Sequence, residues 1–88
     1  MTYSLKVSPR AERSLAKIPK SDRSRIGQLI EGLKKDPRPV GCKKLKGATT
    51  AVFRVRKGDW RVLYTIEDNK LVVLVVDIGH RKDVYKER

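Results

Sequence analysis

The chain has 88 residues, and its 22 Lys and Arg against 10 Asp and Glu give a formal net charge of +12. A chain of this length buries one small core, which argues against two domains, a cofactor-binding α/β enzyme or a large substrate cleft. The longest apolar run, residues 71–76, is far too short to span a membrane, and the N-terminus lacks the pattern of a signal peptide. A single Cys and a single His exclude an internal disulfide and a Cys/His zinc site. We therefore expect one cytoplasmic domain over residues 1–88, with no membrane attachment, metal or small-molecule cofactor.

The positive charge is unevenly distributed along the chain. Residues 1–50 carry 13 basic and 4 acidic side chains, whereas residues 51–88 carry 9 and 6. Such an excess repels itself and favours a polyanionic partner, with nucleic acid the leading class. Aromatic residues make up only 6% of the chain, which argues against a broad stacking surface for single strands.

The N-terminal half predicts one strand followed by two helices. Residues 3–7 alternate apolar and polar side chains, as a half-buried strand does. Ser8 followed by Pro9 is typical of a helix N-cap and first helical residue, and Pro19 ends that helix. We expect Ser21 to cap a second helix that runs to the Asp36-Pro37 stop. Apolar residues at helical spacing mark both buried faces: Ala11, Leu15 and Ile18 in the first helix, and Ile26, Leu29, Ile30 and Leu33 in the second.

The C-terminal half predicts three strands in succession. Residues 38–50 are rich in Pro, Gly and Lys and predict a basic connection with little regular structure. Alternation over residues 53–56 and 60–66, around a Lys-Gly-Asp turn, predicts a hairpin. A second tight turn at Asp68-Asn69 leads into residues 71–78, which are nearly all apolar and predict a central strand covered on both faces. The expected fold is a small single-domain α+β protein of order β-α-α-β-β-β, with an antiparallel sheet and a helical hairpin packed on one face.

Four arginines form the candidate site for an anion. Because Phe53 and Val55 face the core, Arg54 and Arg56 share the opposite face of their strand, about 7 Å apart. Arg61 lies just across the turn and joins them on that uncovered face, and Arg81 follows the central strand closely enough to come in beside them. Guanidinium groups gathered on one open face repel each other unless an anion lies among them, so the cluster predicts a phosphate site.

Two further residues are candidates for chemistry. His80 directly precedes Arg81, and His is the side chain whose ordinary pKa lies near neutrality, which makes His80 the natural candidate for proton transfer. Tyr85 lies four residues beyond Arg81, where its ring would stack on a base or its hydroxyl would donate a hydrogen bond.

The acidic residues indicate which reaction the site would perform. Their spacing does not suit a two-metal nuclease, so any cleavage should be metal-free. For RNA the metal-free route is attack of the 2′-hydroxyl on its own adjacent phosphorus, which leaves a 2′,3′-cyclic phosphate and a free 5′-hydroxyl. That route needs a base, cations on the non-bridging oxygens and an acid for the leaving oxygen. DNA has no 2′-hydroxyl and would not react.

Two stretches carry a resemblance to a known family. Residues 52–64 read Val-Phe-Arg-Val-Arg-Lys-Gly-Asp-Trp-Arg-Val-Leu-Tyr, and residues 79–85 read Gly-His-Arg-Lys-Asp-Val-Tyr. Together with the order β-α-α-β-β-β, they resemble the RelE/ParE superfamily of bacterial and archaeal toxins over essentially the whole chain. The resemblance implies the toxin of a toxin-antitoxin pair that enters the ribosomal A site and cuts mRNA by the 2′-hydroxyl route. It also implies an acidic cognate antitoxin that wraps around the toxin.

The same resemblance implies roles for individual residues that match positions of the family. Arg54 and Arg56 match the basic pair of the second strand of the family, and Arg61 matches its phosphate-binding Arg. Arg81 matches the Arg that steadies the transition state or leaving group, and Tyr85 matches the tyrosine that stacks on the substrate. The basic pair is lysine in the best-studied RelE, where one lysine is a proposed general base, whereas arginine hardly deprotonates. Either the arginines act only electrostatically or His80 takes the proton, and we favour His80 as acid or base with the arginines as the oxyanion clamp.

Two other functions are compatible with the sequence. A ParE-like toxin has the same fold but binds DNA gyrase without catalysis, and the set of arginines with Tyr85 argues for the nuclease instead. A plain RNA-binding domain needs only the charge, and steep salt dependence without cleavage products would support it. We expect the basic N-terminal half to contact ribosomal RNA. An acidic antitoxin segment would lie over the helices or displace the C-terminal tail.

Overall fold

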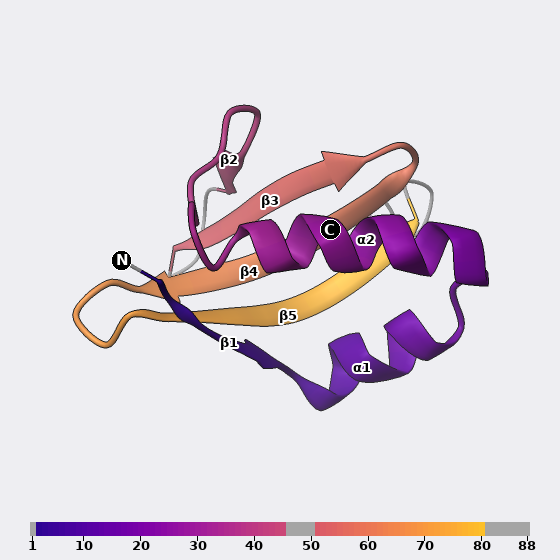
Figure 1. The fold of residues 1–88 in the computed structure, drawn as a ribbon, viewed down its shortest axis with the longest axis horizontal. Helices are drawn as coiled ribbons and strands as arrows, with labels where there is room; N and C mark the ends of the chain where they lie inside the picture. The colour runs from indigo at the N-terminus through magenta and orange to yellow at the C-terminus, as the bar shows by residue number, and fades with distance from the viewer. Residues whose placement is uncertain (1, 46–50, 81–88) are drawn as a thin grey trace.

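The computed structural model describes residues 2–45 and 51–80. These residues form a five-stranded sheet and two helices (Figure 1). The elements in chain order are β1 (Ser4–Val7), α1 (Pro9–Ala16), α2 (Lys20–Gly32), β2 (Lys43–Leu45), β3 (Val52–Lys57), β4 (Trp60–Glu67) and β5 (Val72–His80). The predicted α+β class, the two helices and the three C-terminal strands are confirmed.

The sheet is mixed, which corrects the expectation of a fully antiparallel one. The strand order is β1-β5-β4-β3-β2. The pairs β2–β3, β3–β4 and β4–β5 are antiparallel, but β1 runs parallel to β5, with Leu5 opposite Val73 and Val7 opposite Val75. Alternation of apolar residues predicts which face of a strand is buried but carries no information on strand direction. The chain leaves β1 through the two helices, reaches β2 at the opposite edge of the sheet and returns strand by strand to β5.

The predicted unstructured connection contains a short edge strand. Lys43, Lys44 and Leu45 of β2 pair with residues 52–54 of β3. Three residues, two of them Lys, are too few to show the period-2 pattern of a strand. Lysines on an edge strand also oppose pairing with further chains.

The helix ends follow the capping rules at one start only. Ser8 caps α1 as predicted: its Oγ accepts a hydrogen bond from the Ala11 amide at 3.1 Å, and its hydroxyl donates to the Val76 carbonyl at 2.9 Å. The predicted cap at Ser21 is wrong, because α2 already begins at Lys20 with Pro19 in the cap position and no side-chain hydrogen bond there. The Pro19 carbonyl accepts the first hydrogen bond of the helix, from the Arg23 amide at 2.8 Å.

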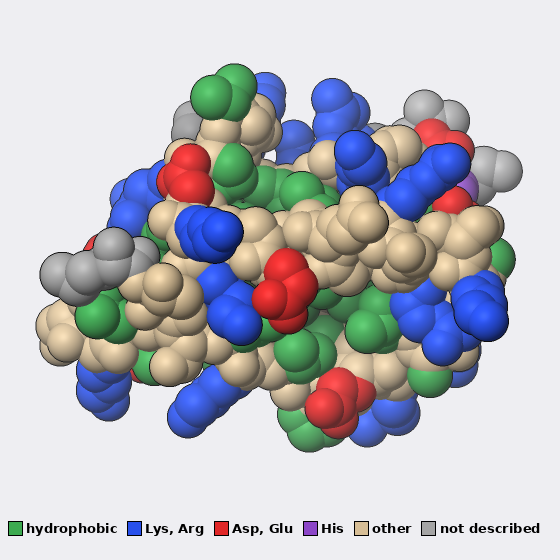
Figure 2. All heavy atoms as spheres, viewed as in Figure 1, with side chains coloured by type: hydrophobic (Ala, Val, Ile, Leu, Met, Phe, Trp, Pro, Cys, Tyr) green, Lys and Arg blue, Asp and Glu red, His purple; other side chains and the backbone are tan. Residues whose placement is uncertain are grey.

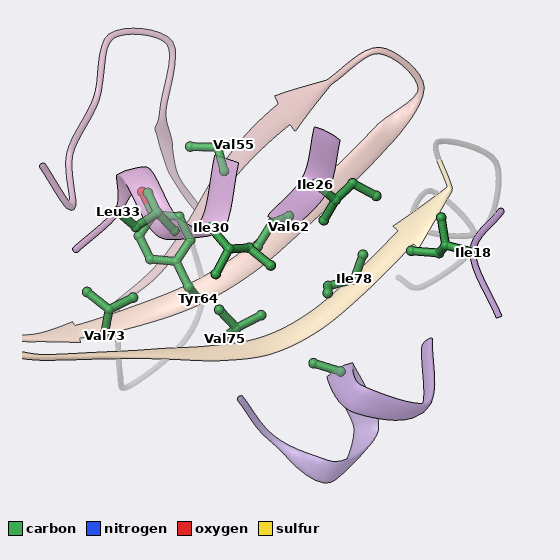
Figure 3. Close-up of a cluster of buried hydrophobic side chains, with 11 residues drawn as sticks. Ile18, Ile26, Ile30, Leu33, Val55, Val62, Tyr64, Val73, Val75 and Ile78 are labelled. Carbon is green, nitrogen blue, oxygen red and sulfur yellow. The ribbon is translucent and has the colours of Figure 1, made fainter. Parts of the chain in front are cut away.

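One core lies between the helices and one face of the sheet. Figure 3 shows side chains of α2 meeting those of β4 and β5, with the Tyr64 ring among the aliphatic groups. The buried apolar residues come from both helices, from the segments that directly follow them and from three strands: Ala11, Ile18, Ile26, Ile30, Leu33, Val55, Val62, Tyr64, Val73, Val75 and Ile78. The Tyr64 hydroxyl donates a 2.7 Å hydrogen bond to the Pro37 carbonyl, which ties the start of the connection to this core. Burial raises the pKa of the Tyr64 phenol well above its ordinary value.

The turn between β4 and β5 is longer than predicted. The Lys70 amide donates to the Glu67 carbonyl and the Leu71 amide to the Asp68 carbonyl, both at 3.2 Å. The residue in the left-handed region is Leu71, with a φ of 53°, and neither Asp68 nor Asn69 adopts it. The predicted two-residue turn is therefore replaced by one that carries a strained non-glycine residue.

Two kinds of feature are absent from the described residues. No helix within residues 2–45 and 51–80 has both the length and the apolar character to cross a membrane. In the same ranges no three His, Cys, Asp or Glu side chains gather in a way that would hold a metal ion.

Candidate functional site

The register of the strands divides the candidate residues between two faces of the sheet. Val55 of β3 pairs with Val62 of β4, which pairs with Ile78 of β5, and this row is buried under the helices. Because successive side chains in a strand alternate between faces, neighbouring rows lie on opposite sides. We call the side under the helices the helix-bearing face. The other side, defined by Arg54, Arg56 and Arg61, is the arginine face.

The arginine face brings together three of the predicted residues. Arg56 of β3 lies directly opposite Arg61 of β4 in the register, and Arg54 is the next residue of β3 on the same side. Directly opposed residues in an antiparallel pair have Cβ atoms about 5 Å apart. The register thus places Arg61 on the same face as the pair, directly across from Arg56. Three guanidinium groups on adjacent positions give a concentration of positive charge suited to the non-bridging oxygens of a phosphate.

The expectation that Arg61 lies on an uncovered surface is wrong, because Arg61 is buried. Only 1% of its surface is exposed, whereas Arg56 is exposed and Arg54 is half-buried. A phosphate arriving at this face would therefore contact Arg56 and Arg54 first, and Arg61 would supply charge from beneath. Burial also restricts the rotamers of Arg61, so its guanidinium is held in place before any ligand arrives.

Asp77 is the acidic residue closest in register to the arginines. It pairs in the sheet with Leu63, which itself pairs with Arg54. Its Oδ2 lies 3.4 Å from Nε of Arg10 in α1, and its Oδ1 accepts a 2.9 Å hydrogen bond from the Ile78 amide. The Asp77 carboxylate is therefore engaged with α1 and with its own strand.

His80 lies on the helix-bearing face, away from the three arginines. It is the last residue of β5 and pairs with Trp60, which pairs with Lys57. Its ring meets the Trp60 ring edge to face, with centroids 5.2 Å apart and planes at 89°. His80 Nε2 also lies 4.0 Å from Oδ2 of Asp59 in the β3–β4 turn. The structure thus places His80 at the same end of the sheet as Arg56 and Arg61 but on the other side.

A pocket of about 530 Å³ opens beside His80. It is lined by Asp22, Arg25 and Ile26 of α2, by residues 57–60 at the β3–β4 turn, and by His80. In Figure 2 acidic and basic side chains gather around the single histidine at this end of the molecule. Sequence reasoning missed the pocket because the position of α2 over the turn depends on tertiary packing. The one sequence signal for the pocket was the strand pattern, which brings Trp60 and His80 together as a pair.

A second polar cluster, also missed, holds the connection against the sheet. Arg38 makes two hydrogen bonds to the Asp68 carboxylate, at 3.1 and 2.9 Å, and the Tyr3 hydroxyl donates to the same carboxylate at 2.7 Å. The Arg38 guanidinium also lies over the Phe53 ring, 5.4 Å from its centroid. The hydrogen bonds from Arg38 and Tyr3 lower the pKa of Asp68, and the hydrogen bond to Asp68 raises the pKa of Tyr3.

The two remaining candidates, Arg81 and Tyr85, lie outside the described residues. The expectation that Arg81 comes in beside the arginine cluster, and the stacking role of Tyr85, therefore stay predictions.

Comparisons with known proteins agree over almost the whole chain. The family model described as ParE toxin of type II toxin-antitoxin system, parDE, matches residues 5–85. The toxin RelG of Mycobacterium tuberculosis is 31% identical over 98% of this chain and 99% of its own length. The mRNA interferase toxin RelE of Escherichia coli is 28% identical over 99% of this chain and 94% of its own.

Solved structures show the same fold. The toxin-antitoxin complex RelBE2 from Mycobacterium tuberculosis contains a chain that superposes with a TM-score of 0.82 at 26% identity, covering 92% of this chain and 100% of that one. The isolated RelE toxin of Escherichia coli gives a TM-score of 0.76 at 26% identity, covering 97% of this chain and 93% of that one. The resemblance to the RelE/ParE superfamily and the predicted fold class are confirmed.

Proposed function

We propose that this chain, which belongs to the ParE toxin family of type II toxin-antitoxin systems and is a toxin of RelE type, is an endoribonuclease that cuts mRNA in the ribosomal A site. The observation that carries the proposal is the opposition of Arg56 and Arg61 in adjacent strands, with Arg54 on the same face. A toxin that only bound a protein surface would have no need for three guanidinium groups at one place. The Escherichia coli relative is named an mRNA interferase, which supports the same activity.

The arginines stabilise charge on the reacting phosphate. The ribose 2′-hydroxyl attacks the adjacent phosphorus, the bond from phosphorus to the 5′-oxygen breaks, and negative charge builds on the non-bridging oxygens. Arg54 and Arg56 bind those oxygens, and the buried Arg61 lends its charge from beneath. Preorganised cations of this kind lower the barrier because they need little rearrangement as the charge develops. The reaction needs no metal ion, since the nucleophile and the leaving group belong to the RNA.

Proton transfer belongs to His80 in this proposal. An imidazole accepts the 2′-hydroxyl proton or donates one to the leaving 5′-oxygen, and arginine does neither at neutral pH. His80 ends β5, and Gly79 before it pairs with Arg61. An RNA strand that crosses this end of the sheet would therefore meet the arginines on one side and His80 on the other. Arg81 and Tyr85 keep the roles that the family resemblance gives them, as stabiliser of the leaving group and as stacking ring.

The partners follow from charge and from the relatives. The RelBE2 structure is a toxin-antitoxin complex, and we infer that an acidic cognate antitoxin binds this chain as well. The net charge of +12 suits both that antitoxin and the ribosome. In this proposal the ribosome supplies RNA backbone for docking and holds the mRNA codon against the arginine face.

Primer extension on an mRNA incubated with the purified protein tests the proposal, with translating ribosomes present or absent. We expect cuts only with ribosomes, and a loss of about 100-fold in rate for Arg56→Ala, since removal of one charge-stabilising donor typically costs that much. Arg13→Ala is the matched control, because it removes one exposed Arg from α1, far from the arginine face. Equal cutting by both variants would contradict the arginine clamp. Absence of any cut would leave gyrase inhibition as the function to test.

A further inference from the structure

The pocket beside His80 has the size and position of a ligand site. Its volume of about 530 Å³ lies within the range of about 300 to 1,000 Å³ found for small-molecule pockets. It is walled by the first half of α2 on one side and by the β3–β4 turn on the other. Lys57 and Trp60 in its wall directly follow and precede Arg56 and Arg61 in the sequence. The pocket and the arginine face are therefore separated by little more than the thickness of the sheet.

The shape of its aromatic wall suits a flat ring. Trp60 and His80 stand at 89° with centroids 5.2 Å apart, so they form a corner with two perpendicular faces. Nucleobases stack on such side chains, and this stacking tolerates any base because each has a flat π face. A base lying against one ring would present its edge to the other walls of the pocket.

The remaining walls of the pocket carry charged groups of both signs. Asp22 of α2 and Asp59 of the turn bring two carboxylates to the pocket, and Arg25 and Lys57 bring two cations. Oδ2 of Asp59 lies 4.0 Å from Nε2 of His80, and Asp22 on α2 is the second carboxylate of the lining. A carboxylate accepts hydrogen bonds through two oxygens at once. Guanine is the standard RNA base whose pairing edge presents two adjacent N–H donors, and the cations suit its phosphate.

We propose that this pocket binds a guanine base of the RNA, with Asp22 accepting from its pairing edge and Trp60 stacking on its ring. The inference rests on the proposed function and adds base selection to it. With the base on the helix-bearing face, the ribose crosses the end of the sheet beside His80. The neighbouring phosphate then reaches Arg56 on the arginine face. The pocket thereby sets which nucleotide is presented for cleavage.

Binding is measurable without cleavage, because Trp60 is the only tryptophan of the chain. Its fluorescence reports directly on the pocket, and a stacked base quenches it. The full-length protein is titrated with GMP, AMP, CMP and UMP at neutral pH. We expect saturable quenching with at least tenfold preference for GMP, about the discrimination that one bidentate contact gives. Quenching that does not saturate, or that is equal for the four nucleotides, would overturn the proposal.

Two variants separate the contacts. Asp22→Asn should lower GMP affinity about tenfold, and Glu12→Gln is its matched control, since both residues lie in the first turn of a helix. Arg25→Gln should weaken GMP binding and leave binding of guanosine, which has no phosphate, unchanged. Circular dichroism verifies that each variant is folded. Equal effects of Asp22→Asn and Glu12→Gln would contradict the role of Asp22.

A third comparison separates a base in RNA from a free nucleotide. The RNA tetranucleotide UUGU should quench Trp60 at lower concentrations than UUAU. Quenching by GMP but not by UUGU would refute recognition of a base in mRNA. Because none of these titrations involves cleavage, quenching by UUGU without ribosome-dependent cutting would uphold the pocket while the proposed nuclease failed.

Discussion

At the scale of single residues, the division of the candidate site between two faces decides what each residue contributes. Arg56 and Arg61 are neighbours in the register, whereas His80 pairs with Trp60 on the other side of the sheet. In the proposed mechanism, charge stabilisation and proton transfer would therefore come from opposite faces and meet only at the end of the sheet. The two contributions are separable by mutation.

Replacing His80 tests its role in proton transfer. His80→Ala should slow ribosome-dependent cleavage by about 100-fold or more, the usual contribution of general acid-base catalysis. Added imidazole should restore part of the rate, because it supplies the missing proton carrier. Single-turnover cleavage assays with and without imidazole measure both effects. A purely structural role for His80 would give a slow variant that imidazole fails to rescue.

Asp68 makes stability depend on pH through its hydrogen bonds with Arg38 and Tyr3. Its pKa is lowered in the folded protein, so its stabilising contribution is complete above the ordinary value of 3.8 and is lost as pH falls through the lowered folded value. Asp68→Asn should therefore lower stability at neutral pH, and the difference from wild type should vanish in acid. Urea denaturation of both proteins at neutral pH and in acid measures the difference in the free energy of unfolding. A pH-independent difference would contradict the mechanism.

Tyr3 gives the opposite dependence at the alkaline end. Its pKa is raised in the folded protein, so its contribution is complete below the ordinary value of 10.0 and is lost as pH rises through the raised folded value. The cluster thus stabilises the contact between the connection and the β4–β5 turn over the whole neutral range.

At the scale of elements, the start of α1 joins a helix to the sheet through one side chain. The Ser8 hydroxyl group caps α1 and also bonds to the backbone of β5. Ser8→Ala should lower the free energy of unfolding by about 1 to 2 kcal/mol, the range for loss of an N-cap. Ser8→Thr keeps the hydroxyl and should lose much less. Chemical denaturation of the two variants side by side measures the difference, and equal losses would show that the hydroxyl is unimportant.

The elements also show what the sequence can and cannot predict. Periodicity predicted both helices and β3, β4 and β5, because each buries a regular stripe such as that of Ile26, Ile30 and Leu33. It did not predict β2, which is too short and too rich in Lys to show a pattern. The parallel pairing of β1 was not predicted for a different reason: side-chain alternation is the same for both strand directions.

The site divides in the same way. The turn between β3 and β4, at Gly58 and Asp59, is tight enough to fix the register of the two strands. The opposition of Arg56 and Arg61 was therefore predictable. The burial of Arg61 and the pocket beside His80 depend on what packs over the sheet, and local patterns carry no such information. The cluster of Tyr3, Arg38 and Asp68 joins residues 65 positions apart, which no spacing rule connects.

At the scale of the whole molecule, the net charge of +12 suits a polyanionic target such as the proposed ribosome. Basic side chains are spread over the helix-bearing side, as Figure 2 shows, so attraction to RNA backbone would extend beyond the arginine face. Such binding releases counterions and weakens steeply with added salt. The more basic N-terminal half should provide most of the ribosome contacts.

Charge reversal after α2 tests this placement. The double variant Lys34→Glu with Lys35→Glu should weaken ribosome association strongly at low salt, and the difference should shrink as salt is raised. Cosedimentation with ribosomes over a salt series measures the association. The double variant Lys34→Gln with Lys35→Gln, which removes charge without reversing it, should fall in between. Unchanged affinity at moderate salt would exclude this region from the ribosome contact.

In the proposed reaction the RNA supplies its own nucleophile, while the protein supplies charge and a proton carrier. The most direct test is a translated mRNA with a single 2′-deoxynucleotide on the 5′ side of the cut, compared with the all-ribose mRNA by primer extension. We predict that the all-ribose mRNA is cut to a 2′,3′-cyclic phosphate and a 5′-hydroxyl. The substituted mRNA should stay intact at that position. Cutting of both at the same rate would contradict the claim.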